Sequence, residues 1–560
     1  MAYFLKIQKQ ANNTYLAIYE SFYSSDTKGT KHRCITSLGS VTKLKALGIE
    51  DPVAFYKAEV ERMNEERKQE TVRMISEVSP EKYLGYFPLK ALLEKLEIKK
   101  YIDLYRLTTE YDFDLYEVLS TLIFARCVHP CSKLKTYNEV LPSLYEGHDF
   151  SYDQLLKGIA FYGNDYEKIV ELFNMQVKEK YSLDTEVTYF DCTNFYFEID
   201  KEDSFRKKGP SKENRKDPIV GLGLLLDAHQ IPIGMKLYPG NESERPVIRE
   251  VIKELKDRHE VEGRTIHVAD KGLNCAANIY SACKNGDGYL FSKSVKQLPD
   301  LEKEWVLLEK DYRPVKDAHG TVLYYWKECV DRFPYRYKDE DGQVHAFTLP
   351  EKRVVTYNPS LAAKKRFEIN RIVEKAKSLS ASLAKRSEYG ESARYVTFQG
   401  KDSDEKVKAV LNQSAIDEDL KLAGFNLLVT SELKMQALDI YHTYHNLWRI
   451  EESFRIMKSD LDARPVFLQR EETIKGHFLI CYLTVLLERI FQFLVLQDKS
   501  SSSDIFSFFK NFRVVETDGK YINVTIGNDF ITKLAAFTNL PLNHYSLSER
   551  QLKKVLNYRL

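Results

Sequence analysis

The spacing of apolar residues changes along the chain, and each change marks a predicted structural region. In residues 1–45 apolar and polar positions alternate with a period of two, which is typical of β-strands. A charged stretch from about Pro52 to Ser76 has helical character, and the helical spacing continues to about Tyr181. Ser79-Pro80-Glu81 combines a hydroxyl cap, a proline and an acid, which indicates a helix start. We therefore expect a β module over residues 1–45 and a helical module over residues 46–182, with strands at Tyr3–Gln8, Thr14–Phe22 and His32–Leu38.

A mixed α/β pattern begins at Thr185. The apolar run Val187–Phe190 ends at Asp191, and the run Arg264–Ala269 ends at Asp270. Three strands and a helix between these runs predict a mixed sheet. They are strands at Asn194–Ile199, Pro218–Leu226 and Pro232–Tyr238 and a helix at Glu244–Arg258.

The α/β pattern is interrupted over residues 296–423. It resumes with the strand Gly424–Thr430 and a helix from about Lys434 to Leu461. We interpret the interruption as a β-rich insertion that carries a basic helix at Leu361–Arg386. The predicted fold class is thus multidomain α/β. Its core consists of residues 183–295 and 424–500, and residues 501–560 form a C-terminal helical region. The strands expected in the insertion are Val322–Val330, Phe333–Lys338, Val344–Leu349, Arg353–Tyr357 and one near Arg394–Gln399.

Composition narrows the classes of protein that fit this pattern. A chain of 560 residues with 43% hydrophobic residues can build several cores, which excludes a mainly disordered protein. The net charge of +1 means that any site for a polyanion must be local. Eight scattered cysteines and an N-terminus without an apolar signal run favour a soluble protein of the reducing cytosol. The apolar stretch His477–Leu496 contains Glu488 and Arg489, so we expect a buried helix there and no membrane partner.

Common nucleotide and metal motifs are missing from the sequence. It contains no Gly-x4-Gly-Lys-Ser/Thr phosphate loop, and Gly221-x-Gly223 lacks the third glycine of a dinucleotide fingerprint. We expect no nucleotide cofactor. Cys127 and Cys131 invite a zinc interpretation, but no second ligand pair lies nearby, so core cysteines are favoured.

Three acids stand out as candidates for chemistry. Asp191 and Asp270 follow apolar strands, where α/β sheets present functional groups, although for either alone an ordinary turn residue is the favoured interpretation. Glu451 lies in the helix after the last strand. Tyr444 and Lys458 stand seven residues to either side of it, and so share its face on a continuous helix. A solvated charged face is the alternative. Together the three carboxylates could bind two Mg²⁺ ions for phosphoryl displacement, with the tyrosine and lysine holding DNA phosphates.

These motifs resemble the DDE transposases of bacterial insertion sequences, in the group whose third motif reads Tyr-x2-Arg-x3-Glu-x6-Lys. The resemblance covers about residues 185–467 and rests on four stretches. Two differences exist: Leu447 replaces the motif arginine, for which Arg449 is a neighbouring substitute, and Leu273 replaces an aromatic residue. The four stretches are Tyr189-Phe-Asp191-Cys-Thr193, Tyr238-Pro-Gly-Asn-Glu-Ser-Glu244, Val268-Ala-Asp270-Lys-Gly272 and the Tyr444…Glu451…Lys458 helix.

The resemblance implies a ribonuclease H-like core with Asp191, Asp270 and Glu451 as ligands of two Mg²⁺ ions, which Mn²⁺ can replace. It also implies that Trp448 lies near the cleaved DNA end. Local charge is consistent with DNA phosphate contact, since six basic residues lie between positions 206 and 216; a solvated face is the alternative. The expected DNA-binding residues are Tyr444, Trp448, Arg449, Arg455, Lys458, Arg206, Lys207 and Lys208.

The predicted function is that of a transposase that binds terminal inverted repeats, cleaves DNA with Mg²⁺ and joins the end to target DNA. We expect a homodimer on DNA, in the bacterial cytoplasm at the nucleoid. Two alternatives remain open from the sequence: a ribonuclease H-like nuclease without strand transfer, and an inactive DNA-binding protein derived from a transposase.

Overall fold

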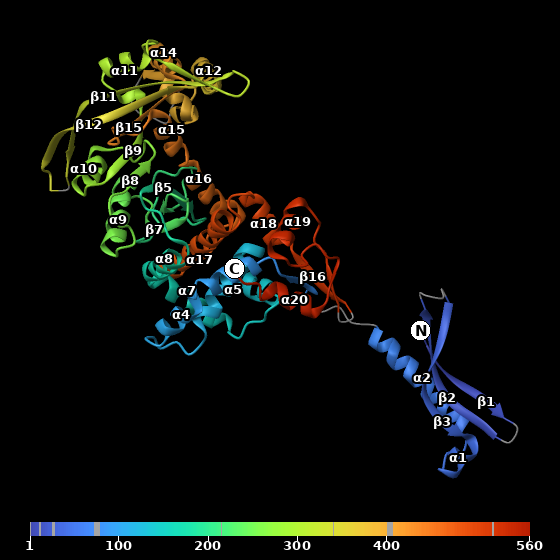
Figure 1. Cartoon of the computed structure of the whole chain (residues 1–560). Coiled ribbons are helices and arrows are strands. Elements are labelled where there is room, and N and C mark those ends of the chain that lie inside the picture. Colours follow the sequence, from blue (N-terminus) through green and yellow to red (C-terminus); the bar gives the residue numbers. More distant parts are fainter. Residues whose placement is uncertain are drawn as a thin grey trace. The chain divides into compact units, whose positions relative to one another are not determined.

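The computed structural model (Figure 1) describes residues 2–10, 13–24, 29–71, 79–213, 215–339, 341–399, 407–517 and 520–560. The chain divides into two compact units, residues 1–79 and 80–560. This division groups the helix α2 (Pro52–Thr71) with the N-terminal strands.

The first unit is an antiparallel three-stranded sheet with two helices. The strands β1 (Tyr3–Gln10), β2 (Asn13–Ser24) and β3 (Gly29–Ser40) lie where alternation predicted them, followed by α1 (Val41–Ala46). Helix α2 is fixed to the sheet by Arg67, which lies 3.0 Å from the buried Glu20, and by Asn64, which bonds the backbone of Tyr3. The predicted helical residues 72–76 lie outside the described part of the chain.

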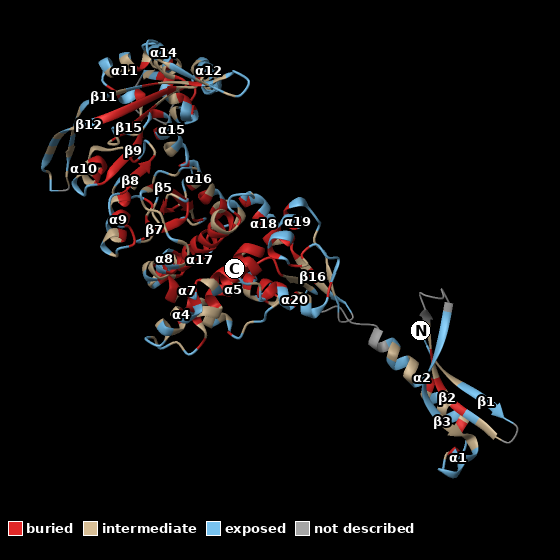
Figure 2. Cartoon of the chain, viewed as in Figure 1, coloured by how far each residue is buried: buried red, intermediate tan, exposed pale blue. Residues whose placement is uncertain are grey.

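The second unit begins with the predicted helices, which surround one long apolar helix, α17 (Glu471–Arg489). Helix α17 packs against α5 and α7 and is buried along its length (Figure 2). The span Glu471–Val495 is long and apolar enough to cross a membrane, yet 83% of it is buried inside the molecule, as expected for a core helix. The surrounding helices are α3 (Phe87–Lys95), α4 (Ile98–Arg106), α5 (Leu115–Val128), α7 (Tyr152–Asn164) and α8 (Tyr166–Tyr181).

The helix start predicted at Ser79-Pro80-Glu81 is wrong. Residues Glu81–Tyr83 form the strand β4, because they pair with β16 (Arg513–Thr517) in a four-stranded sheet of order β18-β17-β16-β4. The pairing joins segments more than 400 residues apart, which no local pattern reveals. The region 501–560 therefore contains strands as well as helices: β17 (Lys520–Asn523), β18 (Ser546–Leu547), α18 (Ser502–Asn511), α19 (Asp529–Thr538) and α20 (Glu549–Leu556).

A nine-stranded mixed sheet forms the α/β core, in the order β10-β11-β12-β15-β9-β8-β5-β6-β7, and its first edge strand is β10 (Arg313–Lys316). The strand β8 runs parallel to both β5 and β9, and the other pairs are antiparallel. Helix α9 (Glu244–Asp257) packs on one face of the sheet and α17 contacts the other side through β7. The central strands are β5 (Val187–Tyr196), β6 (Ile219–Leu226), β7 (Pro232–Pro239), β8 (Ile266–Ala269), β9 (Gly288–Lys293) and β15 (Phe425–Thr430).

Two predicted boundaries in this region change. The runs predicted as two strands, Val187–Phe190 and Asn194–Ile199, merge into one strand, β5, which ends at Tyr196 because its pairing with β6 ends there. The predicted insertion also does not stand apart from the core. Its strands β11 (Val322–Lys338) and β12 (Val344–Tyr357) extend the core sheet through β15, while its basic helix is α12 (Pro359–Ala381).

Candidate active site

The two predicted aspartates lie side by side at the centre of the sheet. In the parallel pair of β5 and β8, Phe190 is in register with Ala269, and Asp191 and Asp270 are the next residues on each strand. Parallel neighbours direct their carboxyl ends to the same edge, which explains why acids 79 positions apart meet.

Asp191 is surrounded by further charged groups. Burial raises its pKa to about 6, and the carboxylates of Glu244 and Asp270 add to this, while Lys212 opposes it. The Lys212 Nζ lies 3.8 Å from Asp191 and 3.6 Å from Glu244, and it donates to the carbonyl oxygen of Cys192. Glu244 is a further acid of the site that the sequence pattern does not single out; its only signal is its place in the stretch shared with the family.

Tyr444 holds the second aspartate. Its hydroxyl donates a 3.0 Å hydrogen bond to Asp270, and burial together with the charge of Asp270 raises the pKa of the tyrosine. Tyr444 lies in helix α15 (Ala437–His445), and strand β15 is the element that precedes this helix in the chain. The hydroxyl is thus engaged with an acid of the site.

The helix predicted from Lys434 to Leu461 is wrong as a single element. It is divided into α15, α16 (Trp448–Arg455) and a π-helical turn, η5 (Ile456–Asp460). At the junction between α15 and α16, hydrogen bonds run from a backbone amide to the carbonyl three residues earlier, which tightens the turn. They join the amides of Leu447, Arg449 and Ile450 to the carbonyls of residues 444, 446 and 447. The angle between Tyr444 and Glu451 therefore differs from that of a continuous α-helix.

The adjacent acids of α16 have different surroundings. Glu452 is paired with Arg489 at 3.0 Å, Arg449 at 3.4 Å and Arg455 at 3.7 Å, so its charge is already compensated. Glu451 is exposed, and no described residue forms a hydrogen bond or ion pair with it. Helix α16 packs against β5, the strand of Asp191.

The predicted DNA-binding residue Lys458 lies near Asp191, but its ammonium group is already paired with another acid. Its Nζ lies 3.2 Å from Glu213, and burial lowers its pKa to about 8 with a contribution from Lys212. Glu213 also pairs with Arg464. The single acid of the basic 206–216 segment thus connects that segment to the chain that follows α16, a contact that sequence reasoning missed.

A family model described as the transposase DDE domain matches residues 183–487, which is more than half of the chain. The chain belongs to the DDE transposases. A search of curated proteins found no match. Among solved structures, the chain is similar to one titled as a cryo-EM structure of the piggyBac transposase synaptic complex with hairpin DNA. The identity is 12%, the match covers 85% of this chain and 86% of that one, and the TM-score is 0.39.

The predicted DNA-binding residues of this transposase differ in how exposed their side chains are and in whether they already pair with an acid. Lys208 and Trp448 are exposed, and Arg449 lies over the Trp448 ring at 4.1 Å while pairing with Asp498. Arg206 is mostly buried and forms a 2.6 Å ion pair with Asp203. The remaining two are Lys207, which is half-buried, and Arg455, which also pairs with Asp460.

A cavity of about 470 Å³ opens beside Asp270 and Tyr444 in the transposase. Part of its wall comes from α12, which brings the predicted basic helix next to an acid of the site. The basic residues that line it are Lys271, Lys293, Lys296, Lys365 and Arg394, and the acids are Asp270, Glu368 and Asp419. Lys296 pairs with Asp419 at 2.6 Å and Lys365 with Glu368 at 3.2 Å. Lys271 and Lys293, which have no acidic partner among the described residues, are therefore the cations available to a phosphate at this cavity.

DDE transposases use divalent metal ions, and the residues present fit such an ion in part. The carboxylates of Asp191 and Asp270 offer oxygen atoms of the kind that Mg²⁺ prefers, and a bound cation would relieve their mutual repulsion. Within the described ranges, no three His, Cys, Asp or Glu side chains are arranged to hold a metal ion, so Glu451 is not gathered with the aspartates here.

Proposed function

We propose that this transposase binds the terminal inverted repeats of its element, cleaves the DNA there and joins the freed end to target DNA. The observation that carries the proposal is the adjacent pair Asp191 and Asp270 beside a cavity lined by five basic residues. A nuclease site needs carboxylates for its metal and cations for the phosphates, and both lie at one edge of one sheet.

We propose a ribonuclease H-like core for residues 183–295 and 424–500. The strand order β7-β6-β5-β8-β9 supports it, with β5 antiparallel to β6 and parallel to β8. Asp191, Asp270 and Glu451 are the proposed ligands of two Mg²⁺ ions, or of Mn²⁺. When bound, these ions would activate the attacking oxygen and stabilise the leaving oxygen of a phosphoryl displacement.

The chain's own residues have separate tasks in this proposal. Tyr444 orients the Asp270 carboxylate through its 3.0 Å hydrogen bond. Lys212 lies between Asp191 and Glu244 and limits their repulsion until DNA and metal are present. The exposed Trp448 is placed to contact the DNA end, and the basic residues of the cavity hold the phosphates.

We further propose that the chain works as a homodimer on DNA, because an element has two ends and each needs a catalytic site. Since its proposed substrate is chromosomal DNA, we assign it to the bacterial cytoplasm, at the nucleoid.

The decisive experiment incubates the full chain with a labelled repeat end, a supercoiled target and one divalent metal. Joined products with Mg²⁺ or Mn²⁺, and binding without cleavage in Ca²⁺, are the expected results, because Ca²⁺ takes a looser and larger coordination geometry. Hydrolysis without joining would indicate a nuclease, and a mobility shift alone an inactive DNA-binding protein. Efficient cleavage in EDTA would contradict the metal proposal.

A further inference from the structure

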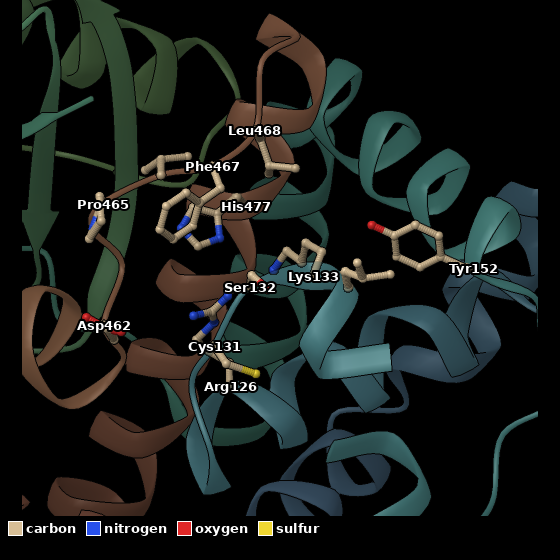
Figure 3. Close-up of a pocket in the computed structure, with 12 residues that line it drawn as sticks. Arg126, Cys131, Ser132, Lys133, Tyr152, Asp462, Pro465, Phe467, Leu468 and His477 are labelled. Carbon is tan, nitrogen blue, oxygen red and sulfur yellow. The ribbon is translucent and has the colours of Figure 1, made fainter. Parts of the chain in front are cut away.

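A second cavity, of about 240 Å³, lies in a different part of the transposase (Figure 3). Its wall is formed by α5, by the short helix α6 (Lys133–Lys135), by residues 462–468 and by α17. We call it the Lys133 pocket. Residues 462–468 follow η5, so the pocket adjoins the segment that carries Lys458. None of the three acids proposed for catalysis lines it.

Two buried cations face this pocket, and neither has an acidic partner among the residues that the structure describes. Arg126 and Lys133 are only 5% and 7% exposed. Arg126 donates one 3.2 Å hydrogen bond to the carbonyl oxygen of Leu461, and within the described part of the chain Lys133 has no hydrogen bond or ion pair from its ammonium group. The acid that lines the pocket, Asp462, is exposed and pairs with neither cation among the described contacts. Burying unpaired charge is costly, so such cations normally have an anion beside them.

The two cations are close enough to affect each other. Burial lowers the pKa of Lys133 to about 7, and the positive charge of Arg126 lowers it further. Figure 3 shows the nitrogen end of Lys133 directed to the side of the pocket where Arg126 and His477 lie. A single anion in the pocket would contact both cations and compensate both charges.

His477 adds an unused hydrogen-bonding atom. Its Nε2 lies 3.2 Å from the carbonyl oxygen of Ala463, so Nε2 carries the proton and Nδ1 is an acceptor. Nδ1 is buried and has no partner among the described residues. The cavity is far larger than the ~10–15 Å³ that one water needs, so it has room for an anion and for a water that donates to Nδ1.

We propose that the Lys133 pocket binds a phosphate group, held by Arg126 and Lys133. A phosphate offers several oxygens to two cations at once, and a guanidinium with an ammonium is a common pair for it. The rim of the pocket is apolar and open, since Phe467 and Leu134 are 70% and 54% exposed. The phosphate could therefore belong to DNA lying across the rim or to a free phosphate in solution, and the two sources are separable by experiment. The proposal does not depend on the chemistry proposed for the aspartates.

The first test compares thermal unfolding of the full chain in inorganic phosphate and in sodium chloride of equal ionic strength. We expect phosphate to raise the Tm of the wild type by about 2 °C, because a ligand that binds only the folded state stabilises it. Lys133→Met keeps the length of the side chain and removes the charge. This variant should have a higher Tm than the wild type in chloride and should lose the response to phosphate. Lys135→Met, on the same short helix but exposed, should respond like the wild type. Equal responses in Lys133→Met and the wild type would overturn the proposal.

A second test identifies the source of the phosphate. If DNA supplies it, Lys133→Met should reduce the slope of log affinity against log salt by about 0.9, the value for one phosphate contact. If the slope is unchanged while the Tm response is lost, the ligand is a free phosphate. If neither the salt slope nor the Tm response to phosphate changes in Lys133→Met, the proposed site is contradicted.

A third measurement uses the wild-type chain alone and so does not depend on the folding of a variant. Crystals soaked in tungstate, a tetrahedral dianion with strong anomalous scattering, should show tungsten between Arg126 and Lys133. A fully occupied tungstate site elsewhere with none in this pocket would refute the proposal.

Discussion

Asp191 is half-buried beside two other carboxylates, and this environment decides how its charge affects the protein. Its pKa of about 6 lies above the usual value near 4 for an aspartate, chiefly because of burial. Between pH 4 and 6 the folded chain therefore retains a proton that the unfolded chain releases. Stability falls as pH rises through this window, and above pH 6 the full cost, about 3 kcal/mol, is present. The ionised Asp191 carboxylate therefore lowers the stability of the folded protein as long as no cation is bound beside it.

Replacing this acid should stabilise the metal-free protein. In EDTA at pH 7.5, Asp191→Asn should raise the Tm, and the gain should shrink as pH falls below 6 and vanish below about pH 4. Calorimetry at a fixed scan rate over pH 4–8 measures this. Asp203→Asn, which breaks the 2.6 Å ion pair with Arg206, is the control and should lower the Tm at pH 7.5. A Tm of Asp191→Asn equal to the wild type at pH 7.5 would show that the carboxylate is not strained.

Tyr444 provides a second test at the level of single residues. Tyr444→Phe removes the hydroxyl that bonds Asp270, a contact worth about 1–1.5 kcal/mol, so cleavage should slow roughly tenfold while DNA binding is unchanged. Tyr441→Phe is the matched control on the same helix, because its ring stacks on Tyr324 and no described residue bonds its hydroxyl. If both variants cleave at the wild-type rate, Tyr444 has no orienting role.

Among the elements, the divided helix after β15 determines which acid is available to the site. The tight turn before α16 and the π-helical turn after it change the rotation of Glu451 relative to Tyr444 and Lys458. The three arginines around Glu452 leave Glu451 as the acid with no compensating partner in the described structure.

This difference predicts unequal effects of two neighbouring substitutions. Glu451→Gln should reduce cleavage about a thousand-fold or more, by removing a charged metal ligand, while end binding survives. Glu452→Gln should leave the cleavage rate of folded protein within about tenfold. It should lower stability by about 1–3 kcal/mol, since Arg489 is fully buried and loses the nearer of its two acidic partners, keeping only Glu488 at 3.8 Å. Single-turnover cleavage and denaturant unfolding measure the two effects; the reverse pattern would assign the third ligand to Glu452.

The basic 206–216 segment is a second element whose side chains differ in role. Arg206 is paired with Asp203, whereas no described acid pairs with Lys207 or Lys208. Replacing both lysines with Gln should flatten the salt dependence of DNA binding by up to about 2 units, with little change in sequence preference. Arg206→Gln, the control, should leave the slope unchanged and lower the Tm. An unchanged slope in the double variant would make this segment an ordinary solvated surface.

At the level of the whole molecule, the division at residues 79 and 80 separates the N-terminal sheet from the rest of the transposase. Each unit has its own buried contacts: Leu16 and Ile18 in the first, and the continuous core around α17 in the second. We propose that the first unit contributes to recognition of the ends.

Deleting residues 1–79 tests whether the first unit contributes to recognition of the ends. The chain 80–560 should unfold cooperatively within a few degrees of the full-length Tm, because its core is intact, and should lose discrimination between repeat ends and unrelated DNA. Calorimetry and competition binding measure the two properties. Full discrimination by the shortened chain would assign end recognition to the second unit.

Elements whose signals are local can be predicted from the amino-acid sequence. Alternating strands, long apolar helices and the pattern of an apolar run followed by an acid at Asp191 and Asp270 can all be recognised within about ten residues. The family motifs are likewise contained in short stretches, which is why the transposase family was correctly predicted.

Which of these residues interact depends on the folded arrangement of the chain. The strand β4 exists because Arg513–Val515 pairs with it, Tyr444 reaches Asp270 across 174 positions, and Glu213 connects the basic segment to Lys458. The Lys133 pocket likewise combines Arg126 and Lys133 with residues 462–468 and His477, which lie more than 300 positions further along the chain. Each of these contacts depends on side chains distant in the sequence, and local propensity contains no information about which distant groups a folded core brings within bonding distance.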